Sequence, residues 1–245
     1  MGEKKILIVH PYDITTSFLE SIASYLRSAF PDDIHYFSIE PNNPSHQQCL
    51  KRIGIHSSNG LIIFLGHGRS DKLYGSRGDE FYADASYDLI AAFPEKYYFN
   101  EDFIHQGNVD VLSGKKVFCL ACNSNDKIAK YAYDKGVTSF LGFGDIPTSP
   151  EELMAIGLQN NGKDIARLMQ VELNYIIKRG LQICIENNST FEQLQNIMEF
   201  IINQRITDYL INNKSLQDRY ILANNLYSLK MNIKIKGNKQ LRIFD

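Results

Sequence analysis

The chain has 245 residues, 44% of them apolar, enough to bury one substantial core or one core with a small appendage. Its 26 Lys and Arg nearly balance its 28 Asp and Glu, and it has no dense basic run, so we expect no nucleic-acid partner. No stretch approaches the roughly 20 apolar residues of a membrane span, and the start, MGEKKILIVH, has too short an apolar run for a signal peptide. Four cysteines without the spacing of a disulfide framework complete the expectation of a cytoplasmic protein that binds no membrane.

Strand and helix patterns alternate over the first quarter of the chain. In chain order they predict a strand over Lys4–His10, a helix over Thr15–Phe30, a strand over Ile34–Ile39, a helix over Ser45–Ile53 and a strand from Leu61. Thr15 or Thr16 is the expected N-cap of the first helix. This order, with short connections, predicts an α/β fold with a doubly wound, mostly parallel sheet and helices on both faces.

The pattern becomes irregular between Arg69 and Gly114, where only Tyr87–Phe93 looks helical. Long irregular excursions in compact domains are often functional loops. Regular patterns then return as a strand over Lys116–Cys122, a helix over Asp126–Asp134 and a strand over Val137–Phe143.

The character of the chain changes after Pro147. Three long helical patterns cover Glu151–Gly180, Thr190–Asn212 and Ser215–Leu229, and the end alternates around Gly237-Asn238 like a terminal β-hairpin. The predicted organisation is an α/β core over residues 1–147 and a mainly helical extension over residues 148–245. The extension could pack on the sheet as part of one domain or form a separate cap.

Two strands end in residues that suggest chemistry. Leu61–Gly68 (LIIFLGHG) stops at His67-Gly68, and Lys116–Cys122 (KVFCLAC) stops at Ala121-Cys122. Neighbouring strands lie about 4.8 Å apart, and the carboxyl ends of strands in an open α/β sheet converge on one crevice. An imidazole there can take the proton of a thiol, whose thiolate is the reactive form of cysteine.

Glycine and backbone groups complete the expected site. Gly68 has no Cβ, so its backbone can approach a substrate carbonyl closely. The N–H groups of Gly68 and Cys122 are therefore the expected oxyanion hole.

Other uses of the cysteines are also consistent with the sequence. Cysteine is among the most buried residue types, and Cys49 and Cys184 are expected to be structural. A CxxC site at Cys119-Leu-Ala-Cys122 is disfavoured, because residues three apart in a strand lie about 10 Å apart, whereas a disulfide needs Cα atoms within roughly 7 Å. No second CxxC or HxxxH supplies further zinc ligands. We therefore expect no metal and no cofactor, and a buried Cys119.

The two strand ends resemble a known family. His-Gly ending one strand and Ala-Cys ending the next is similar to caspase-like cysteine peptidases, which include caspases, gingipains, separases and bacterial CHAT-type proteases. The resemblance is to the CHAT type in particular, in the order FLGHG, NVDVLSGKKVFCLACNSN, a helix and KGVTSFLGFGDIP. It covers about Asn59–Pro147, and the first strands match by pattern alone. The long helical tail and the lack of a recognisable repeat domain depart from the family.

The resemblance implies a caspase-like sheet and a thiol protease with a Cys-His dyad. His67 would be the general base or thiolate partner and Cys122 the nucleophile. Asp145 and Asp13, which follow the last and the first strand, could favour a basic side chain before the cut, but an aspartate in such a position more often caps a turn or helix. No residue stands out as an orienter of His67, and caspase-like enzymes often use a backbone carbonyl for this.

The expected function is therefore a cysteine endopeptidase that cleaves protein or peptide substrates through an acyl-enzyme. A family member without a sensor domain suggests an activating protein partner. The alternatives are a non-catalytic α/β binding or scaffold module and a small-molecule thiol hydrolase.

Overall fold

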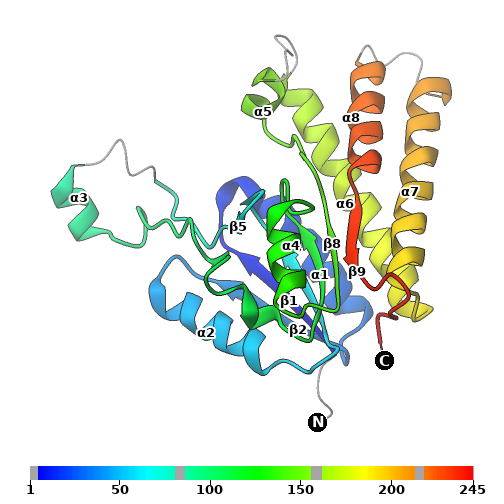
Figure 1. Cartoon of the computed structure of the whole chain (residues 1–245). Coiled ribbons are helices and arrows are strands. Elements are labelled where there is room, and N and C mark those ends of the chain that lie inside the picture. The colour runs from blue at the N-terminus through cyan, green and yellow to red at the C-terminus, as the bar shows by residue number, and fades with distance from the viewer. Residues whose placement is uncertain (1–4, 81–85, 156–161, 213–217, 245) are drawn as a thin grey trace.

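The protein is built around one six-stranded sheet, seen in a computed structural model that describes residues 5–80, 86–155, 162–212 and 218–244 (Figure 1). In chain order its strands are β1 (Ile6–Pro11), β2 (Ile34–Ile39), β3 (Leu61–Leu65), β7 (Lys116–Leu120), β8 (Ser139–Gly142) and β9 (Lys234–Gly237). Their order across the sheet is β2-β1-β3-β7-β8-β9. All neighbouring pairs are parallel except β8 and β9. The predicted α/β class with a mostly parallel sheet is confirmed.

The connections from β1 run to opposite sides: β2 lies on one side of β1 in the sheet, and β3 lies on the other. A 3₁₀ helix, η1 (Ile14–Leu19), and α1 (Glu20–Ala29) connect β1 to β2 on one side, and α2 (Asn43–Ile55) then returns the chain to β3 on the other side of β1. Such a switch point opens a crevice at the carboxyl ends of the strands, where α/β proteins bind ligands.

The sheet is buried on both faces, so its strands are continuous apolar runs with alternating side chains. Ile8, Ile63 and Phe118 belong to a core cluster with α1 and the C-terminal helices. Val9 and Phe64 face the other cluster, which also contains residues of α2 and of α4 (Lys127–Asp134). Helices therefore cover both faces, as predicted.

The start of the first helix differs from the prediction. The chain forms the 3₁₀ helix before α1, and Asp13, not Thr15 or Thr16, caps it by accepting the Thr15 N–H at 2.8 Å. Aspartate is a preferred N-cap because its carboxylate satisfies a free N–H of the first turn.

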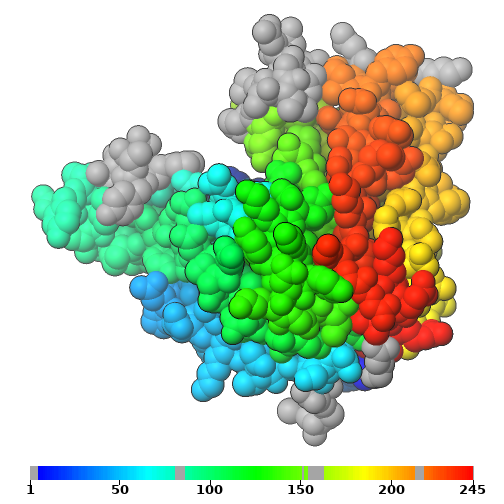
Figure 2. All heavy atoms as spheres, viewed as in Figure 1, coloured from blue at the N-terminus to red at the C-terminus, as the bar shows by residue number. Residues whose placement is uncertain are grey.

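The excursion after β3 contains short elements only. They are β4 (Gly68–Arg69), β5 (Lys72–Leu73), α3 (Tyr87–Ala92), β6 (Ile104–His105) and the 3₁₀ helix η3 (Val109–Leu112). The short strands β4, β5 and β6 form a second, antiparallel sheet in that order. Segment 86–96 around α3 projects from the body as an arm (Figure 2), and α3 has no buried residue.

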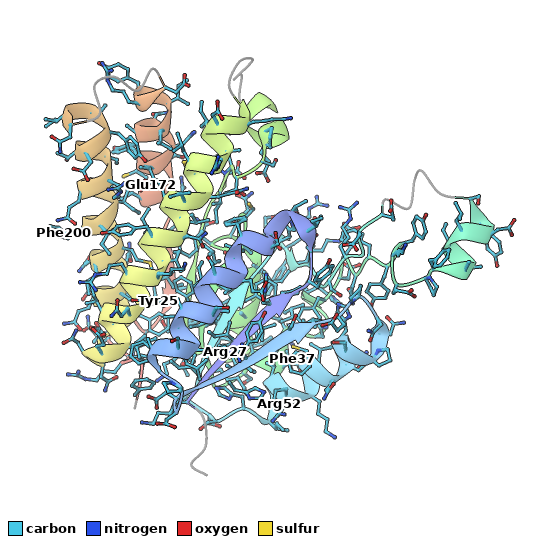
Figure 3. The ribbon with its side chains drawn as sticks, turned by 180° about the vertical axis from the view of Figure 1, so that it is seen from behind. Tyr25, Arg27, Phe37, Arg52, Glu172 and Phe200 are labelled. Carbon is cyan, nitrogen blue, oxygen red and sulfur yellow. The ribbon has the colours of Figure 1, made fainter. Side chains whose placement is uncertain are left out.

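The C-terminal helices pack on the sheet. They are α5 (Pro150–Ala155), α6 (Gly162–Glu186), α7 (Phe191–Thr207), the π-helical turn η4 (Asp208–Asn212) and α8 (Arg219–Met231). α6 lies beside α1. Tyr25 of α1 points toward α6, and its hydroxyl donates to the side-chain amide oxygen Oε1 of Gln182 at 2.6 Å (Figure 3). Residues of α6, α7 and α8 belong to the same core cluster as one face of the sheet.

The predicted terminal β-hairpin is wrong. β9 pairs antiparallel with β8, with Ile235 opposite Leu141, and so becomes the last strand of the main sheet. After the turn the chain does not return along β9; Arg242 instead bridges Thr190. Among the described residues, no helix is long and apolar enough to cross a membrane.

Candidate functional site

His67 and Cys122 follow the carboxyl ends of two neighbouring strands. β3 and β7 pair in parallel, with Leu65 opposite Leu120. The Gly66 N–H donates to the Leu120 carbonyl at 3.1 Å, which extends the pairing to the residue before His67. The expectation that these two segments are adjacent strands is confirmed, and both residues leave the sheet at the same edge.

Both residues also line one narrow pocket of about 20 Å³, which is room for about one water molecule. Its walls come from η1, the ends of β3 and β7, the segment after β8, α5 and α6. The lining residues are Thr16, Phe18, Leu19, Gly66, His67, Leu120, Ala121, Cys122, Ile146, Thr148, Glu152 and Leu173. An apolar wall with a few polar groups is typical of small-molecule and substrate sites. The fold thus brings the predicted base and nucleophile to one cavity.

Cys122 is half-buried, and its sulfur is a neutral thiol. The Sγ–H donates to the Ile146 carbonyl over 3.8 Å. Burial raises the pKa of the Cys122 thiol to about 12, and the negative charges of Glu152 and Asp145 add to this shift. Since the thiolate is the nucleophilic form, this thiol needs a base before it can attack.

A tight turn holds Cys122 in place. Asn123 lies in the left-handed region with φ 54°, which asparagine tolerates better than most residues. Its N–H donates to the Gly144 carbonyl at 2.9 Å, and its side-chain amide donates to Asp145 at 3.0 Å. The turn therefore ties Cys122 to the segment that follows β8.

His67 is anchored by residues that follow β1. Its Nε2 lies 2.6 Å from the Thr15 hydroxyl and 3.8 Å from Asp13 Oδ2. Its side chain is 34% exposed, so one part of the ring is reachable from solvent. β1 is the other neighbour of β3, so three adjacent strand ends supply the site.

Gly68 packs directly against the second strand end. A Cβ at this position would lie 3.1 Å from the Ala121 Cβ and 3.2 Å from the Lys72 carbonyl oxygen. The Tyr74 N–H donates to the His67 carbonyl at 3.0 Å, so Gly68 and its partner Leu73 form a non-hydrogen-bonded pair. The Gly68 N–H is therefore not used by β5.

The two aspartates proposed to bind substrate have different surroundings. Asp13 is buried and accepts both the N–H and the hydroxyl of Thr15 through Oδ1. Asp145 is exposed beside the Cys122 turn, where it accepts from Asn123. Asp145 is thus open to solvent beside the Cys122 turn, whereas Asp13 faces His67.

The remaining cysteines are structural. Cys49, Cys119 and Cys184 are buried, as expected, and all four cysteines are free thiols. The side chain of Cys119 belongs to the core cluster on the α2 face of the sheet. In the described part of the chain, no group of three or more His, Cys, Asp or Glu could hold a metal ion.

Three contributors to the site were not predicted from the sequence. Thr15 contacts His67, Ile146 accepts from Cys122, and Glu152 lines the pocket. The Asp-x-Thr spacing directly after a strand is a signal for an Asx turn. Its proximity to His67 depends on β1 lying next to β3, which local sequence does not show.

Comparison with protein-family models found no match, and comparison with curated proteins found none either.

Proposed function

We propose that the protein is a cysteine endopeptidase with a caspase-like sheet of the CHAT type, in which Cys122 is the nucleophile and His67 the base. The observation that carries this proposal is that both side chains line one pocket at the carboxyl ends of adjacent parallel strands. Cys122 is also the one cysteine of the four that is not buried.

In the proposed reaction, His67 takes the proton from Cys122 as the sulfur attacks the carbonyl carbon of the peptide bond. The oxyanion accepts hydrogen bonds from the N–H groups of Gly68 and Cys122. The tetrahedral adduct then collapses: the C–N bond breaks, and His67 gives its proton to the leaving amine. Water, deprotonated by His67, attacks the thioester, releases the carboxylic acid and regenerates the thiol.

The neutral state of the thiol supports general-base catalysis and not a preformed thiolate–imidazolium pair. Because burial and two nearby carboxylates raise the pKa of Cys122, the resting site is poorly reactive. This fits the expectation that an activating protein partner switches the enzyme on. We also propose that the protein is cytoplasmic, where its four free thiols would stay reduced.

The protonated state of the half-buried Cys122 thiol favours a second candidate, a non-catalytic α/β binding or scaffold module. In that case Cys122 would be a packing residue at the pocket wall, held by the Ile146 carbonyl. A small-molecule thiol hydrolase would share the site with the peptidase and differ only in substrate.

Cleavage of a complex peptide library by the full chain, followed by mass spectrometry, tests the proposal. The assay is run with and without a host-cell extract that could supply an activator. Cys122→Ala should abolish all new cleavage products, and Cys119→Ser should leave most of them. Equal loss in both variants, or full cleavage by Cys122→Ala, would reject the assignment.

A further inference from the structure

The conformation of the chain after β1 is set by a buried aspartate. Asp13 is extended, with φ −161° and ψ 127°, and its Oδ1 accepts the N–H of Thr15 at 2.8 Å. This is an Asx turn, in which the side chain imitates a backbone turn two residues long. It starts η1 and fixes the Thr15 side chain next to the end of β3.

The Thr15 hydroxyl bridges Asp13 and His67. Its Oγ1 lies 2.6 Å from Asp13 Oδ1 and 2.6 Å from His67 Nε2. A hydroxyl has one proton to donate, and a carboxylate can only accept. The Thr15 proton therefore goes to Asp13, and the contact with His67 requires Nε2 to be the donor.

We propose that Asp13 and Thr15 are positioning residues that hold His67 as its Nε2–H tautomer and so leave Nδ1 as the proton acceptor. In neutral imidazole one nitrogen carries the proton and the other accepts, and the hydrogen bond at one nitrogen decides which. The tautomer follows from these contacts alone. Only its consequence, that Nδ1 takes the proton of Cys122, rests on the proposed function.

Asp13 also lies close to the ring directly. Its Oδ2 is 3.8 Å from His67 Nε2, and its side chain is only 7% exposed. The carboxylate therefore faces the same ring nitrogen that contacts the Thr15 hydroxyl. Both contacts come from the segment after β1, and together they fix the orientation of the ring.

Three strands make this arrangement rigid. Val9 of β1 lies opposite Phe64 of β3, and Phe64 lies opposite Cys119 of β7. The Asx turn, His67 and Cys122 are therefore attached to consecutive strands of one buried sheet, which is the support that a positioned base requires.

Nuclear magnetic resonance of the full chain with ¹⁵N-labelled histidine tests the tautomer directly at neutral pH, with His67→Gln identifying the His67 signals. The proposal predicts a proton on Nε2 and none on Nδ1 in the wild type and in Thr15→Ser, which retains the hydroxyl. Thr15→Val, which keeps the shape but loses the hydroxyl, should give a mixture of tautomers. An Nδ1–H tautomer in the wild type, or an unchanged spectrum in Thr15→Val, would overturn it.

The activity of the same variants separates this proposal from the proposed function. Thr15→Val should lower kcat by about one to two orders of magnitude, part of the roughly 10²–10⁴-fold that a positioned general base contributes, with KM little changed. Asp13→Asn keeps the cap, since asparagine is as good an N-cap, but loses the charge and should also lower kcat. A chain that cleaves nothing either alone or with host-cell extract, but shows the Nε2–H tautomer, would reject the peptidase and leave the positioning role standing.

Discussion

The Sγ of Cys122 lies 3.8 Å from the carbonyl oxygen of Ile146 and donates its proton to it. This contact joins the end of β7 to the segment that follows β8 and turns the thiol toward the backbone. Together with the raised pKa of Cys122, it describes a resting site in which the nucleophile is protonated.

Alkylation of Cys122 by iodoacetamide should be slow at neutral pH and should rise with pH. Because the pKa of the thiol is raised to about 12, the thiolate fraction grows about tenfold for each pH unit below that value. Timed alkylation of the folded chain between pH 7 and pH 10, followed by peptide mass spectrometry, measures the rate. A plateau near pH 7 would show a preformed thiolate and contradict this description.

Glu152→Gln should make Cys122 more reactive. Glu152 raises the pKa of the thiol through its charge, second in importance to burial. Its Oε2 also accepts the N–H groups of Thr148 and Ser149, and the amide oxygen of glutamine can keep these bonds. We expect alkylation at a fixed pH to accelerate several-fold with no change in unfolding midpoint. Glu95→Gln, on an exposed part of the arm, is the matched control and should change nothing.

Gly68→Ala should force the two strand ends apart. The new methyl group would lie 3.1 Å from Ala121 Cβ and 3.2 Å from the Lys72 carbonyl. Overpacking of this kind costs about 1–3 kcal/mol of unfolding free energy, and urea denaturation measures it. Ala121→Gly in the same chain removes the first of these contacts, so the double variant should be less destabilised than the sum of the two single variants. If the two changes in unfolding free energy simply add, the contact between position 68 and Ala121 is not the cause of the destabilisation.

Arg205→Leu should destabilise the helical part strongly. Arg205 of α7 forms a two-pronged ion pair with Glu172 of α6, at 2.7 and 2.8 Å, and the Tyr209 hydroxyl donates to the same carboxylate at 2.5 Å. Glu172 is 2% exposed and points from α6 toward the neighbouring helices (Figure 3). Loss of Arg205 leaves a buried charge without its cation, which costs about 3 kcal/mol or more.

Replacing the whole group provides the control for that prediction. A chain with Glu172→Leu, Arg205→Leu and Tyr209→Phe has no buried charge at this point and should recover most of the lost free energy of unfolding. If the single Arg205 variant is as stable as the wild type, the ion pair contributes little to the packing of α6 on α7.

Acidification below about pH 6.5, the ordinary pKa of histidine, should loosen the attachment of the excursion at His46. Burial lowers the pKa of His46, whose Nε2 accepts the Ser76 N–H at 3.0 Å and whose Nδ1 lies 2.7 Å from the Asn42 carbonyl. Because the folded pKa lies below the unfolded one, the unfolded chain binds the proton first. Stability is therefore lost as pH falls through the ordinary value toward the folded one.

His46→Gln separates this effect from the titration of carboxylates. The variant should be less stable than the wild type at pH 7.5, and the difference in unfolding midpoint should shrink by pH 5. A difference that stays constant between these pH values would show that His46 does not titrate in this range.

The sheet was largely predictable because its strands are buried on both faces. Ile34–Ile39 was predicted with the observed bounds, and the pairing of Leu61–Leu65 with Lys116–Leu120 followed from two similar apolar runs. A strand that is buried on both faces needs apolar side chains at every position, so a continuous apolar run in the sequence indicates it directly.

The end of the chain was not predictable in the same way. Its alternating pattern correctly indicates a strand, but the partner is β8 and not the following residues. Gly237, which looked like a hairpin turn, has φ 102° and passes close to the Thr138 carbonyl, where a Cβ would lie 2.5 Å away. Strand pairing over a long sequence separation is decided by tertiary contacts that local pattern does not contain.

The residues of the candidate site that end strands were predicted from the sequence, but the residues that contact them were predicted only in part. His67, Gly68 and Cys122 follow from strand ends, whereas the bridging hydroxyl of Thr15 and the acceptor carbonyl of Ile146 come from other segments. Asp13 shows the difference most clearly. Its position after a strand suggested substrate binding, and the fold instead turns its carboxylate toward His67.

Covalent labelling with a peptide-like electrophile, such as a peptidyl acyloxymethyl ketone, tests the central claim most directly. The reagent requires both an attacking cysteine and a positioned histidine, and mass spectrometry identifies the modified residue. We predict an adduct at Cys122, at least tenfold less in His67→Ala, and none at Cys49, Cys119 or Cys184. Labelling of Cys122 that His67→Ala leaves unchanged, or no preference for Cys122 over the buried cysteines, would contradict the assignment of a cysteine peptidase.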